Sequence, residues 1–279
     1  METLISLKKS SQDSVLVNKK MIFDTHCHLN SKELYKDVEK HINEAKNVGI
    51  ARFLVVGYDY KSSKLAVELA EKYEEIYAAI GYHPTDSITA TKQDFENTFK
   101  YINHPKVVAV GEIGLDYHWI TEPSERELQK ELFIAQIEVA NKHNLPIIIH
   151  CRDAIEDCLE IVKDYHVNKG GVMHCYSGSL DSAYEFIKQG FYISLGGPVT
   201  FTNGKKPKLV ASEVPLDKLL VETDSPYLTP HPYRGQMNAP KHTLLVVQEI
   251  ARLKGLSEEE VASKTYENAI KLFGIKEWL

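Results

Sequence analysis

Several features are scarce in this sequence, and each scarcity excludes a class of protein. No uninterrupted apolar stretch reaches the roughly 18 residues that a membrane-spanning helix needs, so no such helix is expected. Only four cysteines occur in 279 residues, which argues against a disulfide scaffold and favours the reducing cytoplasm. The net charge is -6 and basic residues form no run, so overall charge does not draw the chain to nucleic acid.

The length and composition match a single domain. A chain of 279 residues with 43% hydrophobic residues is close to the roughly 250 residues of a typical (β/α)8 barrel. The first 20 residues include a polar stretch rich in serine and lysine and lack the continuous apolar length of a signal peptide. We therefore expect residues 1–20 to form a flexible extension and residues 21–279 to form one barrel domain.

Short apolar runs recur along the chain and indicate strands. There are eight of them: IFDTHCHL, ARFLVVGY, YAAIGYHP, VVAVGEIGLD, PIIIHCR, GVMHCYSG, FYISLGG and LLVETDSP. Segments of helical period lie between them, such as residues 125–143, whose apolar residues are spaced as on one helix face. Strands that alternate with helices form a parallel sheet, and eight such units predict an α/β fold of the (β/α)8 TIM-barrel type.

Residue types that bind metals stand near the ends of these runs. His26 and His28 are two apart, so strand alternation places both imidazoles on one face. Later runs carry, near their ends, Glu112, His150, His174 and Asp224. Because a parallel barrel brings the carboxyl ends of its strands to one rim, we expect these side chains to form one metal centre.

The donor types indicate the metal and its role. Imidazoles with carboxylates suit zinc, magnesium, manganese, iron or nickel, and the lack of a cysteine ligand pattern argues against a closed structural zinc site. Two divalent ions can be held if Glu112 offers one oxygen to each ion. One site would then use His26, His28 and Asp224, and the other His150 and His174.

Further polar residues lie beside these candidates. Glu222 is expected deeper in the barrel, where it pairs with a ligand or with a basic side chain, or else makes a weak contact with the metal. Asp24, beneath His26, and Asp116, beyond Glu112, are expected to be structural. His83 follows the third run, where it either contacts a phosphate or protonates a leaving oxygen, or else has a structural role in a turn.

Taken in order, the motifs FDTHCHL, GYHP, GEIGLDYH, IIIHCR, MHCYSG, ISLGGPVTF, LLVETDSPYL and HPYRG, with Asn238 and Pro240 after them, resemble the TatD family of metal-dependent deoxyribonucleases. The resemblance runs from Met21 to about Phe273. It implies an amidohydrolase-like barrel that hydrolyses phosphodiester bonds in DNA. It also implies that the metal ligands are His26, His28, Glu112, His150, His174 and Asp224.

DNA is the expected partner, and local cations must bind it. The loops after the fifth, seventh and eighth runs contain the candidate phosphate contacts, which are Arg152, Lys205, Lys206 and Arg234. Aromatic residues in or after the sixth, seventh and eighth runs can stack on bases or pack within loops, and these are Tyr176, Phe201 and Tyr233. With so few cations we expect a preference for DNA ends or single strands, and the sequence indicates no obligate protein partner.

The expected reaction is hydrolysis by a metal-activated water, with Asp224 accepting or directing its proton and Glu112 bridging the metals. The main alternative is hydrolysis of a carboxylic ester or amide, such as the ester of an aminoacyl-tRNA, because such a water attacks carbonyl carbon as well as phosphorus. A non-catalytic metal-binding scaffold is a third hypothesis. It is less favoured because the candidate ligands and the candidate base occur together.

Overall fold

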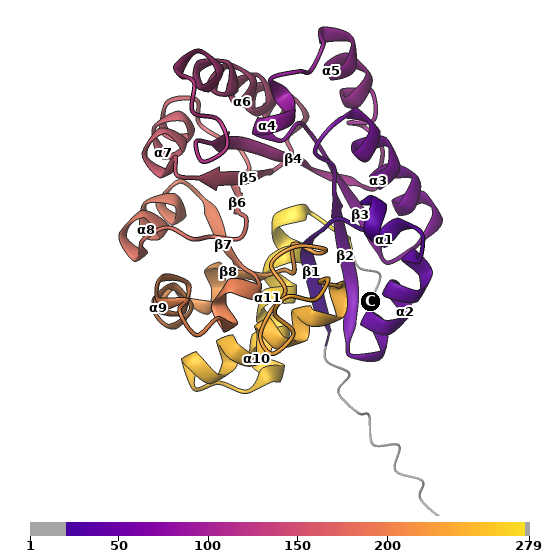
Figure 1. Ribbon diagram of the computed structural model, residues 1–279, viewed down its shortest axis with the longest axis vertical. Helices are drawn as coiled ribbons and strands as arrows, with labels where there is room; N and C mark the ends of the chain where they lie inside the picture. The colour runs from indigo at the N-terminus through magenta and orange to yellow at the C-terminus, as the bar shows by residue number, and fades with distance from the viewer. Residues whose placement is uncertain (1–20, 277–279) are drawn as a thin grey trace, which may run out of the picture.

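Eight strands form one parallel sheet in the order in which they occur along the chain (Figure 1). The computed structural model describes residues 21–276, so the extension expected over residues 1–20 lies outside the described residues. The strands are β1 (Ile22–Cys27), β2 (Ile50–Val56), β3 (Ile76–Ile80), β4 (Val107–Asp116), β5 (Ile147–Arg152), β6 (Gly171–Met173), β7 (Phe191–Leu195) and β8 (Leu219–Val221).

The first and last strands meet and nearly close the sheet. Cys27 forms a parallel bridge with Ser225, whose carbonyl accepts a hydrogen bond of 2.8 Å from the backbone N–H of His28. The backbone N–H of Asp224 donates to the carbonyl of His26 at 2.9 Å. The predicted (β/α)8 barrel is therefore confirmed.

Helices follow the strands and surround the barrel (Figure 1). The α-helices are α1 (Lys32–Tyr35), α2 (Val38–Asn47), α3 (Tyr60–Lys72), α4 (Pro84–Ser87), α5 (Lys92–Phe99), α6 (Pro123–His143), α7 (Ile155–Asp164), α8 (Leu180–Lys188), α9 (Lys205–Glu213), α10 (Thr243–Lys254) and α11 (Glu258–Phe273). Short 3-10 turns are η1 (Gly197–Thr200), η2 (Leu216–Lys218) and η3 (Pro240–His242). No helix in the described part of the chain is long and apolar enough to cross a membrane.

Both faces of the strands are buried, as expected for a parallel sheet covered by helices. In β2, Phe53 and Val55 pack in the outer core, whereas Leu54 and Val56 belong to a second, inner cluster. That inner cluster also contains residues of α11, whose Phe273 ring lies 6.0 Å from the ring of Phe23 in β1. The inner cluster fills the barrel and leaves the opposite end for polar residues.

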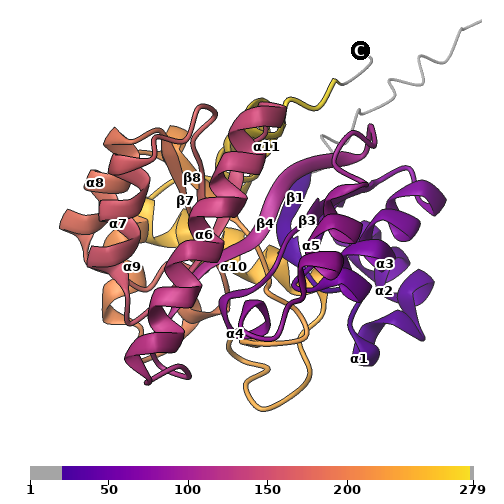
Figure 2. The ribbon, with the colours of Figure 1, turned by 90° about the horizontal axis from the view of Figure 1, so that it is seen from above.

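The polar end of the barrel is formed by the loops that follow the strands. Figure 2 shows α4 and the long loop between β8 and α10 at the same end of the barrel. His28, His83, His174 and Asp224 all follow the carboxyl ends of their strands, and Arg152 is the last residue of β5. The site is therefore assembled at the rim where barrel enzymes carry their chemistry.

Candidate active site

His26 of β1 and His28, which directly follows β1, face two carboxylates across the barrel. The Nε2 atoms of His26 and His28 lie 3.2 Å apart. Oε2 of Glu112 is 3.4 Å from Nε2 of His26 and 3.8 Å from Nε2 of His28. Oδ1 of Asp224 is 3.4 Å from Nε2 of His28 and 3.8 Å from Nε2 of His26. Both imidazoles thus lie within 3.8 Å of both carboxylates, and donor atoms of His26, His28 and Asp224 lie within 4.8 Å of one another.

These separations are those of atoms that share a cation. Ligands about 2.1 Å from a tetrahedral metal lie about 3.4 Å from one another. The five distances run from 3.2 to 3.8 Å and bracket that value. All donors except Asp224, whose side chain is 13% exposed, are almost completely buried. The cluster is therefore a compact, nearly dry donor set with one edge open to solvent.

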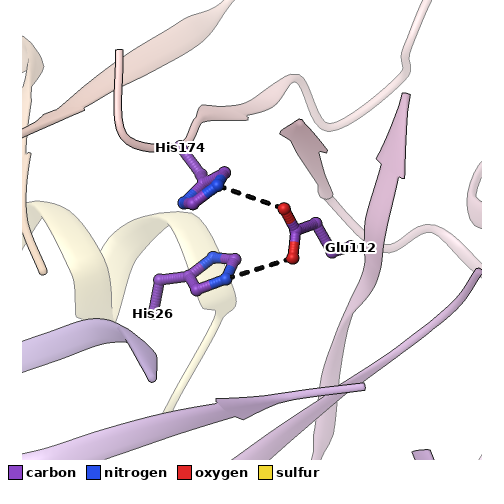
Figure 3. Close-up of side chains that lie close together, drawn as sticks. All are labelled: His26, Glu112 and His174. Atoms are coloured by element: carbon purple, nitrogen blue, oxygen red, sulfur yellow. Dashed lines mark ion pairs between the residues drawn. The ribbon is translucent and has the colours of Figure 1, made fainter. Parts of the chain in front are cut away.

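The other oxygen of Glu112 faces a second set of histidines. Oε1 of Glu112 is 3.1 Å from Nε2 of His174 and 2.9 Å from Nδ1 of His150. In Figure 3 the carboxylate of Glu112 lies between the imidazoles of His26 and His174, one facing each oxygen. Those two rings stack with centroids 3.9 Å apart. Each oxygen of Glu112 therefore faces a different part of the cluster.

His150, predicted to share a site with His174, also contacts a second carboxylate. Its Nε2 atom lies 2.9 Å from Oδ2 of Asp116, so both ring nitrogens face carboxylates. Donor atoms of His83, Asp116 and His150 lie within 4.8 Å of one another and form their own candidate metal group. Asp116, expected to be structural, therefore lies against a candidate ligand. The strand pattern could not show this contact because it joins two strands.

Glycine at position 114 allows β4 and β5 to approach each other beside the cluster. Gly114 pairs with His150 and has a φ of +137°, which side chains rarely adopt. A Cβ atom at this position would also collide with the carbonyl oxygen of His150. A larger residue would push His150 away from Glu112.

The outer hydrogen bonds of the histidines test whether a metal fits. Nδ1 of His28 faces the carbonyl of Val56 at 3.0 Å, so that nitrogen must carry the hydrogen. Nδ1 of His174 faces Oε1 of Glu222 at 3.0 Å. When these imidazoles are neutral, their Nε2 lone pairs point at carboxylate oxygens, and a cation between them removes that repulsion. Such outer partners are typical of metal-bound histidines, and the residues fit the ion.

Burial alone would raise the pKa of Glu112, but His174, His26 and His83 together hold it well below its usual range. Burial would lower the pKa of His174, and the charges of Glu112 and Glu222 instead raise it well above its usual range. Burial would also lower the pKa of His150, but its hydrogen bonds to Asp116 and Glu112 outweigh that effect and raise the pKa to about 9. The carboxylates therefore favour positive charge among the imidazoles.

Asp24 lies beneath the cluster, as expected, and orders the chain after β8. Its Oδ2 accepts a 2.7 Å hydrogen bond from Oγ1 of Thr223, and its Oδ1 accepts one of 2.9 Å from the backbone N–H of Thr223. Burial raises the pKa of Asp24 to about 7, although these hydrogen bonds oppose the rise. The side chain is fully buried and supports the segment that leads to Asp224.

Two glutamines of α6 hold the rim from behind, and the sequence analysis missed them. The backbone N–H of Tyr82 donates to Oε1 of Gln136 at 2.8 Å, and Nε2 of Gln136 donates to the carbonyl of Tyr82 at 3.2 Å. Gln129 clamps the backbone of Asp116 in the same way, at 3.0 and 3.3 Å. Both side chains are buried. Their spacing of two helical turns, on the face of α6 that carries Phe133, was the available signal.

The cluster opens into a cavity of about 390 Å³. It is lined by His28, Tyr58, His83, Thr85, Asp86, Glu112, Asp116, Trp119, His150, Arg152, His174, Asp224 and Tyr227. Thus five of the six predicted metal ligands line the cavity, and the sixth, His26, is fully buried and lies 3.2 Å from His28. Among the predicted phosphate contacts, Arg152 lines it.

The other predicted substrate contacts lie elsewhere. Lys205 is the first residue of α9 rather than part of a loop. The guanidinium of Arg234 lies 3.8 Å from the ring centre of Phe201, and both residues line a separate depression. Tyr233 stacks on His242. Tyr176 is buried, and its hydroxyl donates to the carbonyl of Ser179 at 2.9 Å, which fits the alternative of packing within a loop.

Comparisons with known proteins agree with this geometry. The family model described as TatD related DNase matches residues 23–274. An uncharacterized metal-dependent hydrolase of Bacillus subtilis, YabD, is 50% identical over 256 residues, which cover 91% of this chain and 100% of the relative. An uncharacterized metal-dependent hydrolase of Escherichia coli K12, YcfH, is 37% identical over 258 residues, which cover 91% of this chain and 96% of the relative.

A solved structure gives the same result. The crystal structure of YjjV, a TatD homolog from Escherichia coli K12, matches with a TM-score of 0.86 and 30% identity, over 91% of this chain and 98% of that chain. A hydrolase of the TatD family from Entamoeba histolytica shares the fold at a TM-score of 0.80 and 22% identity, over 90% of this chain and 97% of that chain. With its barrel, its donor cluster and these relatives, the chain belongs to the TatD family of metal-dependent hydrolases.

Proposed function

We propose that this protein is a deoxyribonuclease that hydrolyses phosphodiester bonds in DNA with the help of two divalent metal ions. The observation that carries the proposal is the set of five separations between 3.2 and 3.8 Å among His26, His28, Glu112 and Asp224. Closed structural metal sites are buried on all sides, whereas three of these four residues, His28, Glu112 and Asp224, line an open cavity. An open edge is what a reacting substrate requires.

Two groups of residues would hold the metals. His26, His28 and Asp224 belong to the first group, and His174 and His150 belong to the second. Glu112 joins the two groups because its Oε2 faces His26 and its Oε1 faces His174 and His150. When bound there, divalent ions polarise water and phosphate oxygens and neutralise negative charge in the transition state.

Asp224 is our candidate for the proton acceptor. Burial raises its pKa, but the neighbouring His28, His174 and His26 outweigh that effect and leave the pKa below its usual value. The carboxylate is therefore ionised at neutral pH and can take a proton from an attacking water. Its side chain is the most exposed of the first group and borders the cavity, where such a water must lie.

His83 is our candidate for a phosphate contact. Its Nδ1 accepts a hydrogen bond of 3.2 Å from the backbone N–H of Thr85, so its Nε2 carries the hydrogen. That atom points toward Oε1 of Glu112 at 3.8 Å. Burial and the neighbouring His150 lower the pKa of His83 to about 3, so the ring is neutral. It can donate a hydrogen bond to a phosphate oxygen but does not act as a strong acid.

Arg152 is the cation that we assign to the phosphate next to the scissile one, because it lines the cavity at the end of β5. A role for Lys205 and Arg234 stays a prediction, since both lie outside the cavity and would require a longer DNA strand.

The four cysteines are free thiols, which supports our expectation of the reducing cytoplasm.

The experiment compares phosphodiester and carboxylic ester substrates. Purified protein, stripped of metal and then loaded separately with magnesium, manganese or zinc, is assayed on labelled single-stranded and duplex DNA and on an aminoacyl ester. We expect metal-dependent release of nucleotides or short fragments and no ester hydrolysis above background. Chelation should abolish the nuclease activity while the far-ultraviolet circular dichroism is retained.

A contaminating nuclease must be excluded by a matched variant. Glu112→Gln, prepared in parallel, should lose the activity, because it removes the carboxylate between the two groups. Glu138→Gln replaces an exposed glutamate of α6 and should keep it. Ester hydrolysis without nuclease activity would overturn the proposal in favour of a carboxylic ester hydrolase. Equal nuclease activity in the wild type and Glu112→Gln would also contradict it.

A further inference from the structure

The two most exposed large hydrophobic side chains in the described part of the chain belong to the same cavity. Trp119 is 66% exposed and Tyr227 is 56% exposed, and the other exposed large hydrophobic residues reach at most 50%. Both rings line the cavity that contains the metal-ligand candidates. Single exposed apolar residues are ordinary on a protein surface. Two at the mouth of one polar cavity need a ligand to explain them.

The two rings stand on opposite sides of the barrel. Trp119 follows β4, and Tyr227 follows β8. In an eight-stranded barrel with strands in chain order, these two strands are half a turn apart. Glu112 of β4 and Asp224 after β8 line the cavity with them. The donor cluster therefore lies between two aromatic walls.

Hydrogen bonds hold the backbone of both aromatic residues to the cluster. The backbone N–H of Trp119 donates to Oδ1 of Asp116 at 2.9 Å, and the other oxygen of Asp116 contacts His150. The backbone N–H of Tyr227 donates to the carbonyl of Asp224 at 2.8 Å. Because these anchors are already formed, a ligand that stacks on the rings pays little of the ordering cost.

A cation accompanies one of the rings. The guanidinium of Arg152 lies 5.6 Å from the ring centre of Trp119 and lines the same cavity. An aromatic face beside a guanidinium matches one nucleotide, with the base on the ring and the phosphate on the cation. On the other side, the ring of Tyr227 meets His28 edge to face, with centroids 6.1 Å apart. Stacked ligands there would sit directly beside the candidate metal centre.

We propose that Trp119 and Tyr227 stack on the nucleobases on either side of the scissile phosphate, so that the substrate is a nucleic-acid strand with unstacked bases. This inference rests on the proposed phosphodiester hydrolysis and names its substrate class. A paired duplex keeps the faces of its bases inside the helix, where neither ring can reach them. Single strands and frayed ends expose those faces, and stacking on them tolerates any sequence.

Tryptophan fluorescence tests the stacking without turnover. The chain has two tryptophans, and Trp278 lies outside the described residues. A Trp278→Phe background makes Trp119 the reporter in the full-length protein, with chelator present to stop hydrolysis. We expect a short oligothymidylate to quench the emission and an abasic oligomer of equal length to quench it much less.

Variants then separate stacking from charge. We expect Trp119→Ala and Tyr227→Ala each to weaken oligothymidylate binding on the order of 10-fold relative to abasic binding, the usual worth of one stacked base. Trp119→Phe should recover most of this difference, because it keeps an aromatic face. Arg152→Ala should weaken binding of both oligomers, because it removes a phosphate contact. Tyr165→Ala, an exposed tyrosine at the end of α7, serves as the matched control.

Metal-loaded assays distinguish failure of this inference from failure of the proposed function. One outcome would overturn the stacking alone. The wild type would hydrolyse DNA, and Trp119→Ala and Tyr227→Ala would lose equal activity on abasic and base-containing strands. Base-dependent quenching without hydrolysis of any phosphodiester would uphold the stacking and overturn the nuclease. Binding of blunt duplex as tight as that of single strands would also overturn the inference.

Discussion

Glu222 accepts a 3.0 Å hydrogen bond from Nδ1 of His174 through the same oxygen that accepts one of 2.7 Å from the backbone N–H of Cys175. The carboxylate thus fixes the imidazole so that Nε2 faces Glu112. We expect Glu222→Ala to weaken metal binding about 10- to 100-fold, as loss of such outer partners usually does. Glu222→Gln should lose less, because its carbonyl oxygen can accept both hydrogen bonds. Competition with a chelating dye measures the affinity, and an unchanged value in Glu222→Ala would refute the role.

Asparagine at position 224 separates proton transfer from metal binding. Asp224→Asn keeps the shape and one oxygen but cannot accept a proton, so kcat on single-stranded DNA should fall on the order of 100-fold or more. KM should change little. Elemental analysis should show that Asp224→Asn keeps more metal than Asp224→Ala. Near-normal kcat with full metal content would move the proton acceptor to another residue.

The clamp of Gln136 on Tyr82 predicts a stability effect without any metal. Gln136→Leu leaves the buried backbone N–H and carbonyl of Tyr82 unpaired. Loss of the partner of the N–H alone should lower the free energy of unfolding by about 1–3 kcal/mol. Urea unfolding measures the difference. Glu138→Gln on the exposed side of the same helix should change it by less than about 0.5 kcal/mol. Equal stability of Gln136→Leu and the wild type would show that water replaces the clamp.

Asp24 predicts a pH dependence whose sign follows from burial. Its pKa rises from 3.8 to about 7 on folding, so the folded protein resists ionisation of this group. Relative to Asp24→Asn, the wild type should lose stability as pH rises from about 4 to about 7, and the difference should level off above that. The pKa difference corresponds to a loss of about 4 kcal/mol in the free energy of unfolding. Urea unfolding of both metal-free proteins between these pH values tests it, and a pH-independent difference would contradict the burial of an ionisable group.

The barrel could be predicted because each strand carries its own signal. The eight apolar runs and the helical period of residues 125–143 are local patterns. The structure confirms the runs as strands and the helical segment as α6. The ends of the strands were less predictable. β6 and β8 have three residues each, so His174 and Glu222 lie just beyond their strands. At both points the backbone still bonds to the neighbouring strand, since the N–H of His174 donates to the carbonyl of Ile149 at 3.1 Å and that of Glu222 to the carbonyl of Leu195 at 3.2 Å.

His26 and His28 face the barrel interior as predicted, but strand alternation alone does not place them there. Phe23 packs in the inner cluster, yet His26 also faces the barrel interior, which strict alternation from Phe23 does not allow. The pairing of β1 with β2 shifts between Asp24 and Cys27, and such an irregularity changes which side chains point inward. A register shift depends on the neighbouring strand, so a single strand's sequence does not reveal it.

Contacts between distant segments could not be predicted beyond the shared rim. Asp116 meets His150, and Gln129 meets the backbone of Asp116, through the packing of separate elements. The path of a loop is equally non-local. Arg234 was expected at the metal side because it follows the eighth strand, but its loop carries it over Phe201 and out of the cavity. A residue's position after a strand predicts the rim, not the point on the rim.

The meeting of β1 with the segment after β8 has a consequence for how the protein is made. The backbone N–H of Asp224 is bonded to the carbonyl of His26, so the donor cluster joins one of the first segments of the barrel to one of the last. A ribosome delivers His26 before Asp224. A chain that stops before β8 lacks the closing strand and has an incomplete donor set. The complete donor set therefore forms only when the last strand closes the barrel.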